Sequence, residues 1–342
     1  MVFYRSNTYC GTPQKNLYFL KMEKELKVLS CASFFAGVGG IDQGFENTGH
    51  FSTIYANEID KNACITYESN FSIKVDCRDI NTVQTNEVPK FDVMLAGFPC
   101  QAFSIAGYRQ GINDEKGRGT LFFELVRFIK DKHPKVIFLE NVKNLFGHDN
   151  GNTFRIILEH LNSCGYYVKY QVLNAKDFGN IPQNRERIYI VAFKSKRAFQ
   201  RFDFPSPIAL TTKLADVIDF EGKVEDKYYY TKESCYFYDE LVKNATRSDT
   251  TYQWRRVYIR ENKSNVCSTL TANMGTGGHN VPIVLTKSGF RKLTPHECFN
   301  LQGFPKTYKL PNLAMTHLYK QAGNSVVVSV IERIAENIFK AL

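Results

Sequence analysis

The sequence lacks several features that would assign it to a class at once. No apolar run approaches the roughly 20 residues that a membrane-spanning helix needs. Polar and charged side chains break up residues 1–21 too often for a secretory signal peptide. The nine cysteines contain no Cys-x-x-Cys pair, which disfavours a disulfide framework or a zinc site and suits a reducing compartment. We therefore expect a cytoplasmic protein with no metal site and no membrane partner.

The composition allows a large core without indicating a function. The chain has 342 residues, of which 43% are hydrophobic and 23% charged, as in ordinary globular proteins. This length is sufficient for two lobes. The net charge of +10 points only weakly to a polyanionic partner, since many basic proteins bind no nucleic acid.

Residues 27–193 alternate between short apolar runs and amphipathic stretches. This alternation predicts an α/β fold with a Rossmann-like, doubly wound, mostly parallel sheet. Residues 1–26 have no clear period and are expected to form an N-terminal extension. Residues 194–317 are irregular and predict a smaller, partly β domain. Residues 318–342 predict a C-terminal helix that returns to the first domain and that Ser325 could cap.

A glycine-rich turn follows the first expected strand, at about residues 26–35. Gly37, Gly39 and Gly40 lead into a helix start, an arrangement that presents backbone N–H groups to a ligand. Glu58 comes about 20 residues later, at the end of the second expected strand, where an acidic side chain can accept hydrogen bonds from ribose hydroxyls. Asp79 follows a third short strand and could meet an adenine amino group. Together they indicate an adenosine-containing cofactor, although a tight turn without ligand is the simpler alternative.

Cys100 follows the buried run at residues 92–95 and the sequence Gly97-Phe98-Pro99. Proline restricts the chain before it, so this cysteine is held at a strand's carboxyl end, where open α/β sheets place reacting groups. Glu140 ends the next expected strand, at residues 136–139. Taken alone, Cys100 could be an ordinary buried cysteine and Glu140 a helix-capping partner. Glu140 thus closes the neighbouring strand at the same sheet edge as Cys100.

A basic stretch lies between Lys243 and Lys263, with Trp254 and tyrosines among the charges. This mixture suits contact with phosphates and stacking on bases, and a solvated charged face is nearly as good an interpretation.

With these pieces placed, the chain resembles the cytosine-C5 DNA methyltransferase family over nearly all of residues 27–342, and most closely the bacterial enzymes of restriction–modification systems. Any one of the motifs is weak evidence, but all six occur in the family's order. They are Phe35-Ala36-Gly37-Val38-Gly39-Gly40, Gly97-Phe98-Pro99-Cys100-Gln101, Glu140-Asn141-Val142, Gln183-Asn184-Arg185-Glu186-Arg187, Arg291-Lys292-Leu293-Thr294-Pro295-His296-Glu297-Cys298 and Gly323-Asn324-Ser325-Val326.

The resemblance implies the S-adenosylmethionine-dependent methyltransferase fold and methyl transfer to C5 of a cytosine flipped out of duplex DNA. Residues 27–193 would hold the catalytic and cofactor sites, and residues 194–317 would recognise the target. Cys100 would be the nucleophile, Glu140 would contact N3 and the exocyclic amine, and Arg185 and Arg187 would order the site, with Arg185 facing O2 of the base.

The resemblance also implies sets of binding residues. The cofactor-binding set is Phe35, Ala36, Gly37, Gly39, Gly40, Glu58, Ile59, Asp79, Ile80, Gly97, Pro99, Leu121, Asn324 and Ser325. The expected DNA-binding set is Gln101, Ser104, Arg118, Arg255, Arg256, Arg260, Thr271 and Gly277. We expect a nucleoid-associated monomer, with a cognate restriction endonuclease as a further partner.

Three alternatives stay open at this point. A tRNA methyltransferase of the same family would carry a Cys-Phe-Thr motif, whereas Cys298 is followed by Phe299-Asn300. A nicotinamide oxidoreductase would use the glycine turn but leave the Pro-Cys and Gly-Asn-Ser motifs without a role. A catalytically inactive DNA-binding protein would not need Cys100, Glu140 and Arg185 together. The DNA target sequence cannot be read from the chain.

Overall fold

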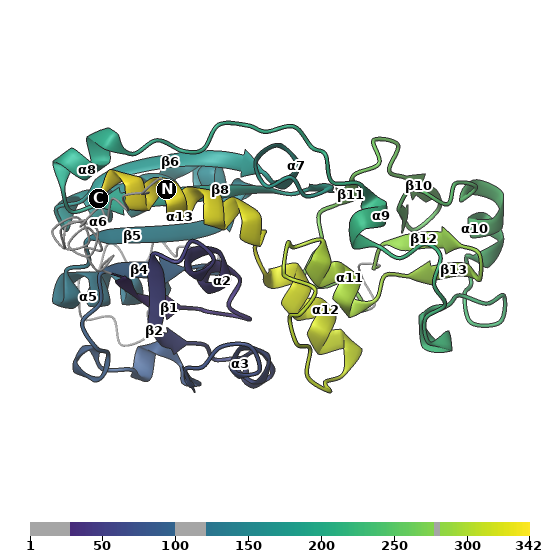
Figure 1. Cartoon of the computed structure of the whole chain (residues 1–342), viewed down its shortest axis with the longest axis horizontal. Helices are drawn as coiled ribbons and strands as arrows, with labels where there is room; N and C mark the ends of the chain where they lie inside the picture. Colours follow the sequence, from purple (N-terminus) through teal and green to yellow (C-terminus); the bar gives the residue numbers. More distant parts are fainter. Residues whose placement is uncertain (1–27, 100–120, 277–280) are drawn as a thin grey trace, which may run out of the picture.

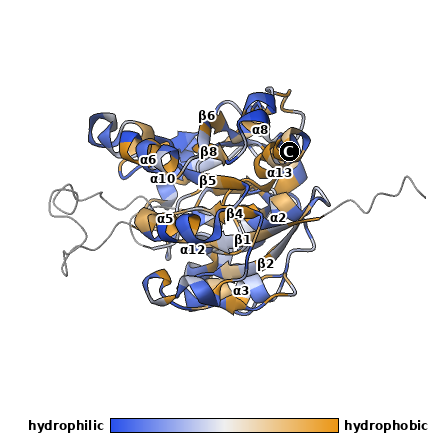
Figure 2. Cartoon of the chain, turned by 90° about the vertical axis from the view of Figure 1, so that its left-hand side faces the viewer, coloured by the Kyte–Doolittle hydropathy of each residue, from blue (hydrophilic) through white to orange (hydrophobic). Residues whose placement is uncertain are grey.

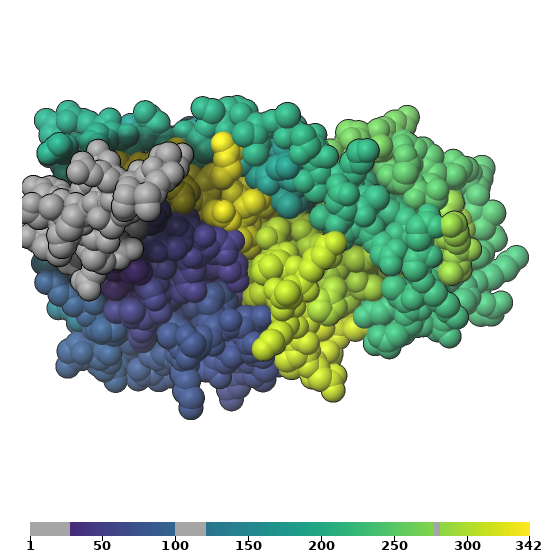
Figure 3. Space-filling view, viewed as in Figure 1, coloured from purple at the N-terminus to yellow at the C-terminus, as the bar shows by residue number. Residues whose placement is uncertain are grey.

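The computed structural model describes residues 28–99, 121–276 and 281–342. They form two lobes side by side (Figure 1). The first lobe is built on a seven-stranded sheet, and the second holds a four-stranded sheet and short helices. In the space-filling view, residues near the C-terminus, drawn in yellow, lie between the two lobes (Figure 3). No helix within the described residues is long and apolar enough to cross a membrane.

The large sheet has the strand order β3-β2-β1-β4-β5-β8-β6. Strands from β3 to β5 pair in parallel, and β8 runs antiparallel to both of its neighbours, so the expected mostly parallel, doubly wound sheet is confirmed. The chain order reverses between β1 and β4, which is where such sheets bind ligands, beyond the carboxyl ends of the strands. The strands are β1 (Leu29–Phe34), β2 (Phe51–Asn57), β3 (Val75–Asp76), β4 (Val93–Ala96), β5 (Val136–Val142), β6 (Tyr167–Asn174) and β8 (Glu186–Phe193).

Helices cover both faces of this sheet, which explains why its central strand β4 is apolar throughout. In Figure 2, α5 and α6 lie on one side of β4 and β5, and α2 and α13 lie on the other. The helices and short 3₁₀ turns of this lobe are α2 (Gly40–Glu46), α3 (Lys61–Glu68), η1 (Ile80–Thr82), η2 (Thr85–Glu87), α5 (Leu121–Lys132), η4 (Lys143–Phe146), η5 (His148–Gly151), α6 (Asn152–Ser163), α7 (Ala175–Phe178), α8 (Lys196–Arg201) and α13 (Val328–Ala341).

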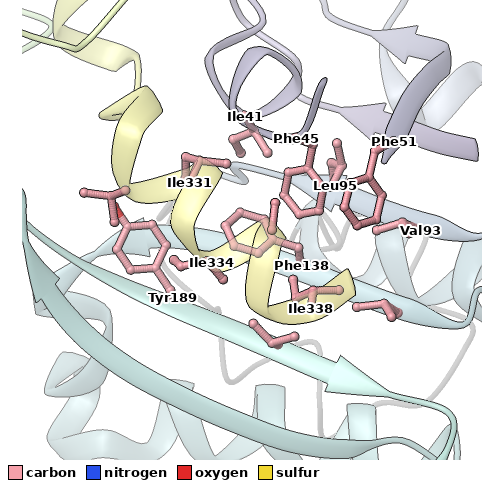
Figure 4. Packing of buried hydrophobic residues seen from close by; sticks show 14 of the residues in the cluster. Ile41, Phe45, Phe51, Val93, Leu95, Phe138, Tyr189, Ile331, Ile334 and Ile338 are labelled. Atoms are coloured by element: carbon pink, nitrogen blue, oxygen red, sulfur yellow. The ribbon is translucent and has the colours of Figure 1, made fainter. Parts of the chain in front are cut away.

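The last helix, α13, returns to the first lobe as expected. Ile331, Ile334 and Ile338 occur at helical spacing on one face and pack with Phe138 of β5 and Phe45 of α2 (Figure 4). All five side chains are fully buried. This packing fixes the C-terminus against strands that lie about 200 residues or more earlier in the chain.

Two expected boundaries differ from the structure. The region 318–342 is two helices, because α12 (Met315–Asn324) belongs to the second lobe and the chain is extended at Ser325 before α13 begins. Ser325 is thus the C-cap residue of α12, and its side chain does not cap α13, whose N-cap is Val327. The first lobe also continues past residue 193, since Phe202 of the segment after α8 is buried in its core.

The second lobe carries the antiparallel sheet β10-β9-β12-β13 and a two-stranded ribbon of β11 and β7. Its strands are β9 (Tyr252–Trp254), β10 (Ile259–Glu261), β11 (Cys267–Ser268), β12 (Ile283–Thr286) and β13 (Gly289–Lys292). Of these, β11 pairs in parallel with β7 (Gln183–Asn184). Its helices are α9 (Leu214–Val217), η6 (Asp226–Tyr228), α10 (Tyr238–Asn244), α11 (Pro295–Asn300) and α12.

A buried ion pair stabilises the motif at residues 291–298 and explains why it contains both an arginine and a glutamate. The Arg291 guanidinium donates two hydrogen bonds to the Glu297 carboxylate, at 2.8 and 2.7 Å, and neither side chain is appreciably exposed. Glu297 also accepts from the Thr294 backbone N–H, and Thr294 caps α11 in return, with Pro295 in the first turn. This motif therefore has a structural role in the second lobe.

Candidate functional site

The glycine turn after β1 adopts backbone conformations that few side chains tolerate. Phe35, Gly37 and Gly39 all have positive φ, at 54°, 56° and 77°. A Cβ atom on Gly39 would lie 2.3 Å from the Phe71 ring, so only glycine fits there. A Cβ on Gly37 would meet nothing within 4 Å, which shows open space on the outer side of the turn. The turn therefore presents its backbone to a volume that a ligand could enter.

Glu58 joins the end of β2 to this turn. Its carboxylate accepts hydrogen bonds from the Gly37 N–H at 2.9 Å, the Ile59 N–H at 2.9 Å and the Asp60 N–H at 2.8 Å. An ionised carboxylate has about four acceptor positions, so about one remains for a ligand. Glu58 thus shapes the glycine turn in addition to any contact with a ribose.

Asp79, a further residue expected to contact the cofactor, follows β3, and hydrogen bonds hold the end of this strand near Glu58. The Glu58 N–H donates to Asp76 O at 3.2 Å, and the Asn57 side chain donates to the carbonyls of Asp76 and Arg78. These bonds hold the end of β3 beside the end of β2. Asp79 follows, caps η1 through Asn81 and is exposed. Its neighbour Ile80 is buried, whereas Ile59, which follows Glu58 in the sequence, is exposed.

The structure places the Gly323-Asn324-Ser325-Val326 motif next to the glycine turn that follows β1. A Cβ on Gly40 would lie 2.6 Å from Ser325 Oγ. This hydroxyl is buried and has no hydrogen-bond partner within the described structure. A buried hydroxyl without a partner costs free energy, and a ligand that bonds it would remove that cost. Asn324, the last residue of α12, is exposed beside it.

Glu140 and Arg187 form a buried pair at the ends of β5 and β8. Arg187 Nε lies 3.1 Å from Glu140 Oε1, and both side chains are largely buried. Burial raises the pKa of the Glu140 carboxyl, while the positive charges of Arg187 and Arg185 oppose that shift. Glu140 Oε2 also lies 3.7 Å from the position of a Cβ on Gly97. The carboxyl group therefore faces the end of β4, as its position in the sequence predicts.

Asn141 fixes the chain that leads to Cys100. Its side-chain amide donates to Phe98 O at 2.8 Å and accepts from the Val142 N–H at 2.8 Å. The residue is 3% exposed. Sequence reasoning gave Asn141 no role, although its place beside Glu140 in a motif could have indicated one. The bond to Phe98 holds the residue just before Pro99, and the bond from Val142 orients the Asn141 amide.

Arg185 has a different environment from the one expected. Its guanidinium donates to Leu270 O at 2.8 Å, to Gly323 O at 3.1 Å and to Ser325 O. Burial lowers the pKa of this group, and three carbonyl acceptors offset that cost. With these bonds made, the side chain joins β7–β8 to the second lobe and to the α12–α13 connection. The guanidinium therefore lies in this junction, bonded to the backbone, which does not support the expected contact with O2 of a base.

Gln183 and Gly323 complete this junction between the lobes. The Gln183 side chain donates to Leu301 O at 2.7 Å and accepts from the Leu270 N–H at 3.0 Å. A Cβ on Gly323 would lie 2.2 Å from the Thr271 carbonyl, so the two backbones can approach only at glycine. Sequence reasoning missed Gln183, whose fully buried amide makes the same kind of contact as Arg185.

Four of the expected DNA-binding residues line one cleft of about 640 Å³ in the second lobe. Arg255, Arg256 and Arg260 are exposed there, on and around the β9–β10 hairpin, and Thr271 also lines the cleft. None of the three arginines forms an ion pair with a residue that the structure describes. Asn184 of β7, one residue before Arg185, also lines the cleft. The cleft is thus a cationic surface.

The remaining expected site residues lie outside the described part of the chain. They are Cys100, Gln101, Ser104, Arg118 and Gly277. Pro99 is the last described residue before Cys100, and Leu121 is the first one after this gap, where it begins α5. The histidine, cysteine and acidic side chains in residues 28–99, 121–276 and 281–342 form no group of three that could hold a metal ion.

Comparison with known proteins gives consistent matches over almost the whole chain. The family profile described as C-5 cytosine-specific DNA methylase matches residues 29–340. The type II methyltransferase M.Bsp6I of Bacillus sp. (strain RFL6) is 64% identical over 315 residues, which are 92% of this chain and 100% of the relative. The type II methyltransferase M.HhaI of Haemophilus parahaemolyticus is 38% identical over 331 residues, 94% of this chain and 97% of the relative.

Solved structures with lower identity show the same fold. A DNMT2 variant of Spodoptera frugiperda superposes with a TM-score of 0.70 at 21% identity and covers 91% of this chain and 99% of its own. The Dnmt2 methyltransferase of S. pombe gives 0.70 at 19% identity, with coverage of 91% and 98%.

Proposed function

The chain belongs to the C-5 cytosine-specific DNA methylase family, and from this premise we propose how its residues methylate C5 of cytosine in duplex DNA. The observation that carries the proposal is the buried Glu140–Arg187 pair, which faces the end of β4 just before Cys100. Cytosine C5 is a poor nucleophile until a group adds to C6. A thiol and a carboxyl on adjacent strand ends provide the groups that this addition needs.

The residues around the glycine turn fit S-adenosylmethionine. The open space at Gly37, the unpartnered Ser325 hydroxyl and the remaining acceptor position of Glu58 surround one turn between β1 and α2. Glu58 would accept from the ribose hydroxyls, and Asp79 would accept from the adenine amino group. Phe35, Pro99 and Asn324 would line the remaining walls. When bound, this cofactor supplies an electrophilic methyl group.

Cys100 adds to the base in the proposed mechanism. Its thiolate forms a bond to C6, and the displaced π electrons of the C5–C6 bond make C5 nucleophilic while negative charge develops toward N3 and O2. Glu140 donates a proton or hydrogen bond to N3, a role that its raised pKa supports. Arg187 takes the role at O2 that was expected of Arg185. Loss of the C5 proton and cleavage of the bond between sulfur and C6 release Cys100.

The cationic cleft would hold the DNA. Arg255, Arg256 and Arg260 would contact phosphates, since they are exposed and free of ion pairs with the described residues. A base inside a duplex cannot reach Cys100, so the target must leave the stack. We propose further contacts from Gln101, Ser104, Arg118, Thr271 and Gly277.

The relatives named type II methyltransferases support a role in a restriction–modification system. We propose that the protein acts in the cytoplasm as a monomer associated with the nucleoid, and that a cognate endonuclease cuts the same site when it is unmethylated.

Covalent trapping on 5-fluorocytosine tests the proposal. Fluorine cannot leave C5 as a proton does, so duplex DNA with 5-fluorocytosine at the target should stay bonded to Cys100 in the presence of the cofactor. Bisulfite sequencing of DNA from cells that express the protein would first identify the target. The Cys100→Ser variant, whose hydroxyl ionises far less readily, should form no adduct. An adduct at another cysteine, or one formed with tRNA but not with DNA, would contradict the proposal.

A further inference from the structure

Two cysteines meet next to the segments that carry Glu58 and Asp79. Cys64 lies on α3 and is buried, and Cys77 follows β3 and is exposed. Their sulfur atoms are 2.8 Å apart. No other two thiols within the described residues lie within hydrogen-bonding distance. Since a disulfide bond is about 2.05 Å long, the two sulfurs are within about 1 Å of bonding distance.

The pair connects the segments that carry the two carboxylates of the pocket. Cys64 Sγ donates to the carbonyl of Glu58 at 3.5 Å. Cys77 lies two residues before Asp79, in the segment that the Asn57 side chain holds through the carbonyls of Asp76 and Arg78. These bonds hold the two segments side by side, so the two thiols remain together in the folded protein.

We propose that Cys64 and Cys77 are a reversible thiol–disulfide site, oxidised by hydroperoxides, that weakens cofactor binding in the oxidised form. The effect on binding rests on the proposed function of Glu58 and Asp79. The disulfide itself depends only on the geometry of the two sulfurs. Disulfides in reducing compartments are generally transient and redox-sensing, which suits such a site.

The exposed thiol reacts first in this scheme. The Cys77 thiolate attacks one oxygen of hydrogen peroxide, which breaks the O–O bond and gives a sulfenic acid and hydroxide. Burial raises the pKa of the Cys64 thiol, so Cys64 stays protonated until it attacks the Cys77 sulfur. That attack forms the S–S bond and expels the sulfenic oxygen as water, after transfer of the thiol proton. In total, two thiols and one peroxide give one disulfide and two waters, and a dithiol reverses the oxidation.

Oxidation changes the pocket in two ways. The Cys64 S–H that donates to the Glu58 carbonyl is lost. The sulfurs must also approach each other, which draws the segment that leads to Asp79 toward α3. Both changes alter the spacing between the carboxylates that would hold the ribose and the adenine. We expect a several-fold lower affinity for S-adenosylmethionine.

Peptide mapping tests the disulfide without reference to activity. The full-length protein is treated with hydrogen peroxide, its free thiols are alkylated, and tryptic peptides are identified by mass. The expected product is a cross-linked peptide pair that contains Cys64 and Cys77, is two hydrogens lighter than the separate peptides and disappears with dithiothreitol. The Cys77→Ser variant should not form it. Recovery of alkylated Cys64 together with Cys77 in a sulfinic form would overturn the site.

Calorimetry with S-adenosylmethionine tests the consequence. Oxidised wild type should bind several-fold more weakly than reduced wild type and recover after dithiothreitol, whereas Cys77→Ser should bind equally before and after peroxide. Equal affinities of the mapped disulfide form and the dithiol form would overturn the regulatory effect. Failure of the reduced protein to bind would contradict the proposed function instead, and the mapping would still decide the disulfide.

Discussion

The two lobes use polar side chains in opposite ways. In the first lobe, the side chains of Glu58, Asn141 and Arg185 each make two or three hydrogen bonds, and every partner is a backbone group. In the cleft of the second lobe, Arg255 and Arg256 reach solvent without an ion pair to any described residue. Catalysis at one atom of a substrate requires side chains that the fold already holds in place. Contact with DNA phosphates requires cationic side chains that are not already paired with carboxylates.

Arg185 connects the first lobe with the second, and its removal should have the largest effect on stability. Arg185→Ala would leave the carbonyls of Leu270, Gly323 and Ser325 without their donor. Because hydrogen bonds to charged groups contribute about 1.5–3 kcal/mol each, we expect the free energy of unfolding to fall by at least about 3 kcal/mol. Urea denaturation followed by fluorescence would measure it. We also expect the lobes to unfold in separate steps.

The neighbouring Arg187 provides the matched control for Arg185. It pairs with Glu140 and makes no contact across the lobes through its guanidinium in the described structure. Arg187→Ala should therefore reduce turnover strongly while keeping a single unfolding transition. If both variants lost the same stability and both kept one transition, Arg185 would not be the junction between the lobes.

Asp42 should make the stability of the first lobe depend on pH. It is fully buried and accepts hydrogen bonds from Ser33 and Tyr67, and burial raises the pKa of its carboxyl to about 6. Its stabilisation is complete below the unfolded pKa near 4 and is lost as pH rises through about 6, because the folded state must then bury a charge.

The Asp42→Asn variant cannot ionise and should not show this loss. The difference in unfolding free energy between wild type and variant should decrease by roughly 3 kcal/mol between pH 4 and 7, since the pKa shift is roughly two units. Urea titrations across that range measure it. A difference that is constant with pH would show that Asp42 keeps its ordinary pKa.

Glu140 should govern turnover and its pH dependence. Glu140→Gln keeps the shape of the side chain but removes its proton, so we expect kcat to fall by about 10²-fold, at the lower limit for general acid catalysis. If the protonated form of Glu140 is active, the wild-type rate should fall as pH rises through the raised pKa of Glu140. The variant should not show this decrease. Single-turnover rates from pH 5 to 9 would show it. A wild-type rate that increases over this range would exclude the acid role.

The smallest expected effects concern the cleft. If Arg255, Arg256 and Arg260 contact phosphates, each alanine variant should reduce the slope of log K against log salt by roughly 0.9. Arg247→Ala is the matched control, because Arg247 is already paired with Asp249 and Glu261. Binding to target and non-target duplexes over a salt series would measure the slopes. Unchanged slopes for all three variants would place the DNA surface elsewhere in the second lobe.

The sheet edge that carries the site could be predicted from residue order. Glu58, Cys100 and Glu140 each follow an apolar run, and parallel strands bring such positions to one edge. The contacts of Glu58 and Glu140 agree with this expectation. Arg185 could not be assigned in the same way, because its partners Leu270 and Gly323 are 85 and 138 residues away in the chain. Nothing in the local pattern separates it from Arg187.

The sequence by itself determined what depends on neighbouring residues: the strands and helices of the first lobe, the glycines of its turn and the order of the motifs. Short-range periodicity and backbone sterics fix these features. Only the tertiary structure decided which of two arginines joins the lobes, where Ser325 lies and that Cys64 meets Cys77. Those outcomes depend on how distant segments pack, because hydrogen-bond partners and burial are set by the folded arrangement as a whole.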